Sequence, residues 1–167
     1  MNYARSRLAT SSFTSGALPA GAIAGLAGGV IEIGWVALYQ NLAGQGADVV
    51  ARGVTQSVFP TLATAPAGVT LGIVIHMILA VALGIAIAVL VRKLAPQIVG
   101  TTMEPVTVVG ILVGVWAMNF LVILPAINPS FVTLMPFAAT LASKVLFGFA
   151  AAFVLSFASR QAKRRSM

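Results

Sequence analysis

Long apolar runs dominate the chain, and short polar or basic stretches separate them. Four of the runs are long enough to cross a bilayer as helices, which takes about 20 residues. They cover about 17–39, 69–91, 106–126 and 137–158. Runs this long and this rich in Ala, Leu and Gly predict helices rather than the shorter, alternating strands of a membrane barrel. The pattern therefore predicts an all-α integral membrane four-helix bundle that forms a single transmembrane domain over residues 1–167.

Composition supports this class and excludes others. Hydrophobic residues make up 59% of the chain and charged residues 8%, whereas an ordinary soluble domain contains about 25% charged residues. There is no cysteine, which excludes disulfides, thiolate metal sites and cysteine nucleophiles. The net charge of +7 falls in clusters that flank the apolar runs and contain no interleaved aromatics, so it does not predict nucleic-acid binding.

The basic clusters predict how the spans are oriented. They precede the first run, separate the second from the third, and follow the fourth, while the other two loops hold only Arg52. Because an excess of Lys and Arg marks the cytoplasmic side, both termini are predicted to be cytoplasmic. The first run is longer than the core of a signal peptide, so we interpret it as an uncleaved helix. The predicted cytoplasmic basic residues are Arg5, Arg7, Arg92, Lys93, Arg160, Lys163, Arg164 and Arg165.

The outer ends of the runs carry local signals. In the first outer loop, residues 40–68, apolar residues recur at helical spacing and predict a short amphipathic helix on the membrane surface that ends at Pro60; the alternative is an irregular loop. Trp35 and Tyr39 are predicted to be interfacial anchors. Pro125 predicts a kink or the end of the third helix. The helically spaced residues are Ala47, Val50, Ala51, Val54 and Val58.

Each apolar run contains one strongly polar residue, and all four lie at a similar depth. Counted from the outer end of its run, each is seven residues inside, which is about 10 Å at 1.5 Å per residue. A lone charge at this depth costs about 2.5–3.5 kcal/mol, so Lys144 is expected to pair with Glu32. His76 and Asn119 are expected to complete the hydrogen bonds. This intramembrane polar layer consists of Glu32, His76, Asn119 and Lys144.

Small residues recur at four-residue spacing around three of these polar residues. Such stripes let membrane helices approach closely, so Glu32, His76 and Lys144 are expected to face other helices rather than lipid. Two glycines on the third run give the same signal for a helix contact. The predicted helix-packing residues are Gly21, Gly25, Gly28, Gly72, Ala80, Gly84, Gly110, Gly114, Gly148 and Ala152.

Several roles are compatible with the polar layer. The simplest is that it fixes the register of the helices. The alternatives are a proton or ion path through Glu32, His76 and Lys144, or a site where Lys144 holds an anionic lipid or quinone head group. A metal site is not predicted, because Glu32 and His76 offer only two good ligands beside a cationic lysine. A single histidine excludes a two-histidine haem within the chain, so no intrinsic cofactor is predicted.

The sequence contains no enzyme motif: there is no phosphate-binding loop, no nucleophile elbow, no HExxH and no carboxylate pair. We therefore predict a non-enzymatic protein. The leading hypothesis is an accessory or assembly subunit that packs, within membrane lipid, against other integral membrane subunits of a respiratory or other redox complex. The alternative is a small oligomeric transporter or channel that uses Glu32, His76 and Lys144.

Four stretches, "AGAIAGLAGG", "GIVIHMILAVALG", "VGVWAMNFLVILP" and "SKVLFGFAAAF", carry a resemblance that covers most of the chain. With them, the chain resembles small four-helix bacterial inner-membrane proteins of unknown function. The resemblance implies a membrane location and a helical fold, but no activity.

Overall fold

The computed structural model describes the backbone of residues 3–165 and the side chains of residues 16–164. Within this part of the chain every regular element is helical. Four helical segments are long and apolar enough to cross a membrane: Gly16–Leu42, Gly68–Leu94, Met103–Ile127 and Phe137–Arg164. The predicted all-α class is therefore confirmed, and each of the four predicted apolar runs lies within one of these segments.

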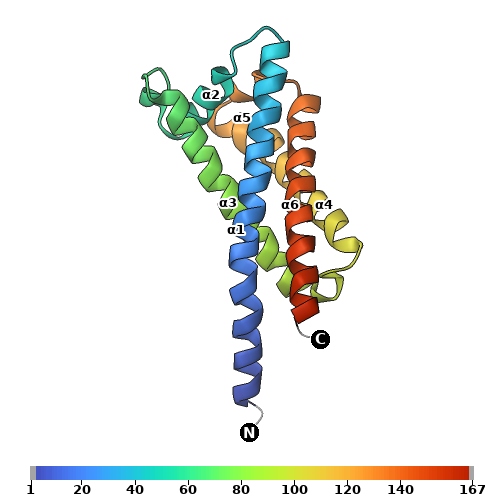
Figure 1. The fold of residues 1–167 in the computed structure, drawn as a ribbon. Helices are drawn as coiled ribbons and strands as arrows, with labels where there is room; N and C mark the ends of the chain where they lie inside the picture. Colours follow the sequence, from blue (N-terminus) through green and yellow to red (C-terminus); the bar gives the residue numbers. More distant parts are fainter. Residues whose placement is uncertain (1–2, 166–167) are drawn as a thin grey trace.

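The four spans are built from five α-helices and a π-helical turn, and a further helix lies between the first two spans (Figure 1). The turns between helices are short 3-10 segments. The span helices are α1 (Tyr3–Leu42), α3 (Gly68–Leu94), α4 (Met103–Met118), the π-turn η3 (Asn119–Ile123), α5 (Leu124–Ile127) and α6 (Phe137–Arg165). The remaining elements are α2 (Asp48–Val58), η1 (Pro60–Leu62), η2 (Pro96–Ile98) and η4 (Phe131–Thr133).

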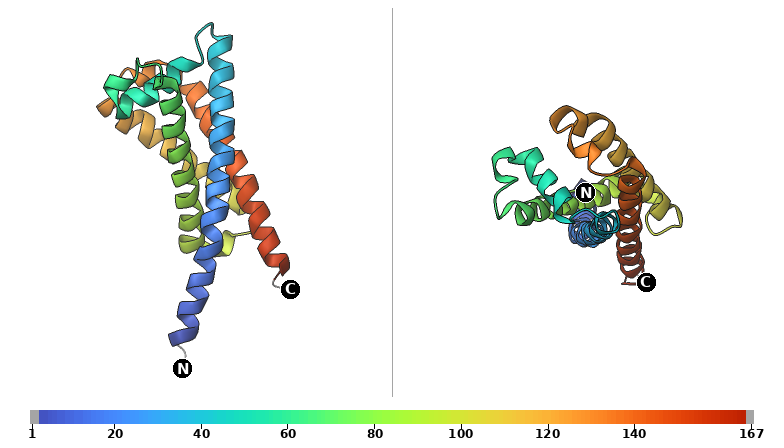
Figure 2. Two further views of the ribbon diagram at one scale, coloured as in Figure 1. Left: turned by 60° about the vertical axis from the view of Figure 1, so that its left-hand side comes forward. Right: turned by 90° about the horizontal axis from the view of Figure 1, so that it is seen from above.

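The long helices form a curved row in the order α3, α1, α6, α4. Helix α1 packs along α3 and along α6, and α4 packs on α6. Helices α3 and α4 hardly contact each other, and the view from above shows their outer ends apart, with the lower end of α3 beside the start of α4 (Figure 2). In a closed four-helix bundle each helix packs against two neighbours. Here α3 and α4 do not pack along each other, so the arrangement departs from the predicted bundle.

Glycines bring the backbones of α1 and α3 together. A methyl group at Gly21 would lie 2.7 Å from the Cα of Ile85, and one at Gly25 would lie 2.7 Å from the Cα of Val81. Gly84 is enclosed in the same way by the backbone of α1. Gly21 and Gly25 of the stripe predicted on α1 and Gly84 of the stripe predicted on α3 therefore lie in the interface of these two helices, as expected for helices that associate by close van der Waals contact.

Helix α6 packs against α1 and α4 with its own small residues. The ring of Phe147 is fully buried and lies over Gly28 of α1. On the α4 side, Gly148 lies against Leu112, and Ala152 belongs to the same buried cluster. The predicted stripe on α6 thus lies in the apolar core.

Two of the predicted packing residues contact nothing in the described chain. Gly110 and Gly114 are exposed, and a methyl group at either position would have no atom within 4 Å. Val108 and Leu112 of α4 lie in the core. Gly110 and Gly114 each follow one of them by two residues, which is about 200° around the helix axis, so both glycines face away from the core. Within the described part of the chain, no other helix therefore approaches these two glycines, and the predicted helix contact there stays a prediction.

The helix predicted in the first outer loop is present as α2, and it ends two residues before Pro60. It lies across the outer end of α3, where Gly72 faces the backbone of Ala51. The hydroxyl of Thr55 donates to the carbonyl of Gly68 at 2.6 Å. One side of α2 is therefore fixed to α3.

Arg52 holds the loop that follows α2. Its guanidinium pairs with Asp48 at 3.1 Å and donates to the carbonyls of Ala63 and Ala65 at 2.9 and 3.1 Å. These bonds add to the backbone hydrogen bonds of the turn between α2 and α3. The one basic residue of the outer loops thus has a local structural use.

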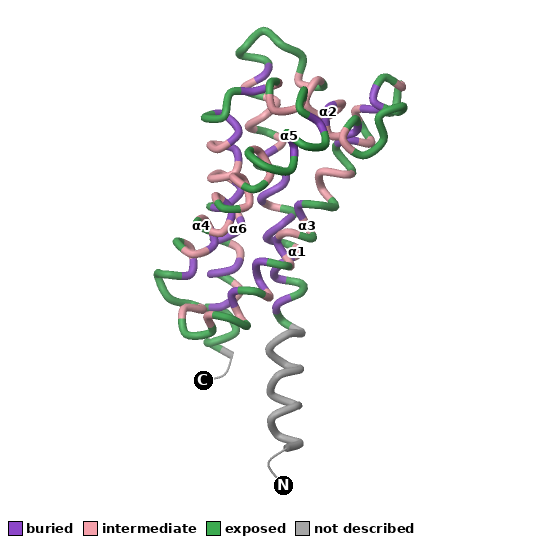
Figure 3. The backbone as a smooth tube through the Cα atoms, turned by 180° about the vertical axis from the view of Figure 1, so that it is seen from behind, coloured by how far each residue is buried: buried purple, intermediate pink, exposed green. Residues whose placement is uncertain are grey.

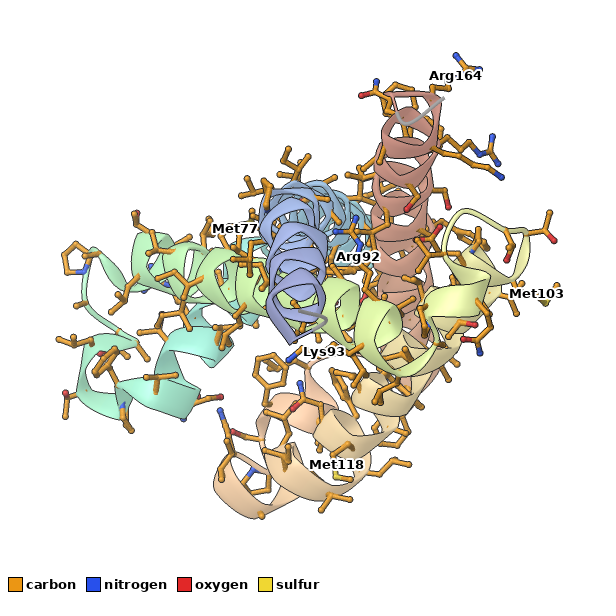
Figure 4. All side chains as sticks on the ribbon, turned by 90° about the horizontal axis from the view of Figure 1, so that it is seen from below. Met77, Arg92, Lys93, Met103, Met118 and Arg164 are labelled. Atoms are coloured by element: carbon orange, nitrogen blue, oxygen red, sulfur yellow. The ribbon has the colours of Figure 1, made fainter. Side chains whose placement is uncertain are left out.

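Basic side chains gather at the opposite end of the molecule. Seen from below, Arg92 and Lys93 lie at the end of α3 and Arg164 at the end of α6 (Figure 4). The predicted basic residues Arg5, Arg7 and Arg165 are outside the described side chains. At this end Glu104 is buried and accepts hydrogen bonds from the Gly100 amide at 2.8 Å and the Ser159 hydroxyl at 3.2 Å, which joins the start of α4 to α6.

Candidate functional site

An ion pair joins α1 to α6 inside the row of helices. Lys144 Nζ lies 2.8 Å from Glu32 Oε2, and the two side chains are 12% and 10% exposed. The neighbouring Ser143 donates its hydroxyl to the other carboxylate oxygen of Glu32 at 3.2 Å. The pairing expected between the acid and the base of the spans is therefore present, and α6 contacts both oxygens of the carboxylate.

His76 brings α3 to the same cluster. Its Nε2 lies 3.7 Å from Glu32 Oε2, which is too long for a hydrogen bond. The Nε2 atom is buried and has no hydrogen-bond partner among the described residues. Most buried polar atoms in proteins are paired, so this nitrogen is an open hydrogen-bonding position beside the ion pair.

Asn119 comes from the other side, at the start of the π-turn η3. The amide of Leu124 donates to the carbonyl of Asn119, five residues earlier, which widens the helix at this point. Pro125, which was expected to kink or end the helix, is the second residue of α5, the helix that directly follows this turn. The structure thus brings Glu32, His76 and Lys144 together, while Asn119 faces the same space from η3. Single π-turns inside helices are frequently found at functional sites.

A cavity with a volume of about 570 Å³ lies at this polar cluster. Helices α1, α3 and α6 and the η3–α5 segment form its walls, and α2 covers its outer side. The amide of Asn128 donates to the hydroxyl of Ser57 at 2.9 Å, which ties α2 to the turn after α5. Apart from the polar cluster, most lining side chains are apolar; they include Ile33, Val54, Ile73, Leu79, Phe120 and Ile123.

Toward the basic end, tightly packed apolar residues close the space below the cluster. Phe147 is fully buried, and its ring centre lies 5.1 Å from Lys144 Nζ. Ala24, Ala80 and Leu112 complete this core. Among the described residues the polar cluster therefore has no polar continuation through the centre of the helices toward the basic end.

Two tryptophans connect helices close to the cavity. Trp35 donates its indole N–H to the carbonyl of Ala139 at 2.9 Å, and its ring centre lies 6.4 Å from that of Tyr39. Trp116 donates to the hydroxyl of Thr140 at 3.0 Å. Trp35 was predicted only as an interfacial anchor, so its bond between α1 and α6 is an additional role.

Sequence reasoning missed Ser143 and the cavity itself. Ser143 directly precedes Lys144, but a single serine in an apolar helix carries no specific signal. The cavity depends on the separation of α3 from α4 and on the widened turn before Pro125, neither of which a hydropathy pattern contains. No group of three or more metal-ligating side chains occurs among the residues that the structure describes.

Comparison of the chain with protein-family models, curated proteins and solved structures finds no match in any of the three. Its function is therefore inferred from its own geometry.

Proposed function

We propose that the protein is a non-enzymatic, multi-pass membrane protein that serves as an accessory or assembly subunit, and that the outer face of α4 packs against another integral membrane subunit. The observation that carries this proposal is how little of α4 the chain itself covers. Only 11% of the most apolar stretch of Met103–Ile127 is buried, against 39% for Phe137–Arg164. The tube in Figure 3 shows exposed positions along α4.

The composition of this face favours a helix as its neighbour rather than lipid alone. Gly110 and Gly114 have no side chains and so leave a shallow depression on α4. Each glycine inside a helix makes that helix less stable than alanine would, by about 1 kcal/mol. In membranes this loss is offset where small residues let a second helix approach closely. Larger exposed side chains flank the depression: Met103 is 54% exposed, Val106 64% and Met118 55%. Met103 lies at the outer edge of the molecule in Figure 4.

The proposed location is the bacterial inner membrane, with both termini in the cytoplasm. The described basic residues at the ends of α3 and α6 support this orientation through the positive-inside rule. For the partner, a respiratory or other redox complex is the class that we propose to test first, because such complexes commonly recruit small helical subunits.

The alternative function is a small oligomeric transporter or channel that uses Glu32, His76 and Lys144. The cavity beside these residues favours it, since ionisable groups within a membrane often mark a pathway. The packed core around Phe147 argues against a path through a single chain. The subunit role therefore has the stronger support.

Substituting Gly114 with Leu is expected to release the partner. The isobutyl group would fill the depression on α4 and prevent close approach, so recovery of the partner after extraction in mild detergent should fall at least about tenfold, corresponding to a loss of about 1.4 kcal/mol. Mass spectrometry of the co-purified proteins measures this. Gly34→Leu is the matched control, because Gly34 on α1 also has no atom within 4 Å of an added methyl group.

The control variant is expected to retain the partner at the wild-type level. A wild-type protein that runs alone as a monomer would contradict the subunit role. A homodimer without any other protein would contradict the accessory role but would keep α4 as an interface.

A further inference from the structure

The cavity at the polar cluster has the properties of a small-molecule site. Its volume of about 570 Å³ lies within the usual range for ligand pockets, about 300–1,000 Å³. Voids left by ordinary packing are rarely larger than a water molecule. Polar groups converge at one place in the wall, and most of the remaining wall is apolar. This distribution fits an elongated molecule with a small polar head and an apolar body.

The hydrogen-bonding groups at the polar end select a head group that accepts hydrogen bonds. Glu32 is satisfied by Lys144 and Ser143. The lysine ammonium carries three N–H donors, of which one is directed to Glu32. The buried Nε2 of His76 has no partner among the described residues. The lysine donors are therefore available, and His76 donates as well in the tautomer that carries its proton on Nε2, while the carboxylate acceptors are already engaged.

The charge of the cluster favours a neutral head group. Lys144 and Glu32 balance each other at 2.8 Å, so the pair presents little net charge to a ligand. An anionic head group would have to compete with Glu32 for the lysine and would lie close to a negative carboxylate. Carbonyl oxygens accept hydrogen bonds without bringing a charge.

The depth of the cluster indicates how a ligand reaches it. The polar residues are about seven positions from the outer ends of their predicted runs, which places them about 10 Å inside the hydrocarbon region. A phospholipid head group lies at the membrane surface, whereas a molecule dissolved in the bilayer can present a small head at this depth. Helices α3 and α4 do not pack along each other, so the cavity is approached from the side through lipid.

We propose that this cavity binds a lipid-soluble quinone. A carbonyl oxygen of the quinone accepts hydrogen bonds from Lys144 and His76, and its ring lies near Phe120 on the η3 wall. The isoprenoid tail follows the apolar wall and leaves between α3 and α5. The proposal concerns binding alone and assigns no electron transfer. It uses the η3–α5 segment and no residue of α4, and is therefore independent of the partner interface proposed above.

Quinone binding is tested with a decyl-tailed benzoquinone added to the purified full chain in phosphatidylcholine nanodiscs. Quinones quench tryptophan fluorescence, and Trp116 stacks at 6.0 Å on Phe120, which lines the cavity. Saturable quenching is expected for the wild type. The His76→Leu variant is expected to bind about tenfold more weakly, the loss of roughly one hydrogen bond.

A second pair of variants distinguishes quinone binding in the cavity from partitioning of the quinone into the surrounding lipid. Val54 lines the cavity from α2, and Val54→Phe is expected to fill the space and abolish saturable quenching. Val74→Phe is the matched control, because Val74 is exposed on α3 and is not part of the lining. It should bind as the wild type does. The thermal midpoint of each variant is measured in the same nanodiscs.

His76 Nε2 has no partner to lose in the fold, but the His76 ring also hydrogen-bonds the backbone of Gly29. His76→Leu is therefore expected to stay folded and to lower the midpoint by no more than the loss of about one hydrogen bond. Quenching of the wild type that does not saturate would overturn the proposal. Undiminished binding by a folded His76→Leu or Val54→Phe variant would also overturn it. Saturable binding of oleate or phosphatidylglycerol, together with no saturable quenching by the quinone, would assign the cavity to an anionic lipid instead.

Discussion

Replacing Lys144 with Met is expected to destabilise the protein by about 3–5 kcal/mol, because it leaves the carboxylate of Glu32 buried without its counter-ion. Glu32→Gln should have an effect of similar size, since it leaves the lysine ammonium unpaired between α1 and α6. The double variant Glu32→Gln/Lys144→Met removes both charges and is expected to be milder than either single change. Equilibrium unfolding in mixed detergent micelles measures all three.

The exposed ion pair on α2 supplies the control for this experiment. Asp48 and Arg52 are also paired, but their side chains are 50% and 35% exposed, and exposed pairs contribute about 0–1 kcal/mol. Asp48→Asn should therefore change the unfolding free energy little. Effects of Glu32→Gln and Lys144→Met that simply add in the double variant would show that the two residues are not coupled, contrary to the structure.

Replacing Gly84 with Ala is expected to destabilise the protein by about 2–3 kcal/mol, near the upper end for overpacking. The added methyl group would lie 2.6 Å from the Cα of Gly25. A backbone atom cannot rotate away as a side chain can, so α1 and α3 must separate. The thermal midpoint and the protease resistance of the purified protein measure the loss.

Gly34→Ala is the matched control for Gly84→Ala. Nothing lies within 4 Å of a methyl group at Gly34, so this change is expected to be neutral or to stabilise α1 by up to about 1 kcal/mol. Equal destabilisation by both variants would mean that the glycine interface between α1 and α3 is not what holds these helices together.

The sequence was most informative where the membrane itself imposes the structure. A backbone in lipid must satisfy its own hydrogen bonds, so the four apolar runs had to be helices. A buried charge must find a partner, so the pairing of Glu32 with Lys144 followed from their both lying inside spans. The close contact of α1 with α3 followed from glycines at four-residue spacing, of which Gly21, Gly25 and Gly84 are the clearest.

Features that depend on how helices diverge could not be predicted in the same way. The pattern of Gly110 and Gly114 is the same kind of signal as that of Gly21 and Gly25, yet it faces outward because α4 presents Leu112 to the core. Pro125 predicted a disturbance of the helix, but not that it would take the form of a π-turn at Asn119. The cavity depends on this widened turn and on the separation of α3 from α4.

Another membrane protein is expected to cover the outer face of α4, and site-specific photo-crosslinking in intact membranes tests this directly. A benzophenone side chain is introduced at Met118 of α4, which is 55% exposed, and separately at Ile78 of α3, which is 63% exposed. We expect a defined protein adduct from position 118 and only lipid adducts from position 78. Lipid adducts alone at position 118, or the same protein adduct from both positions, would contradict the account.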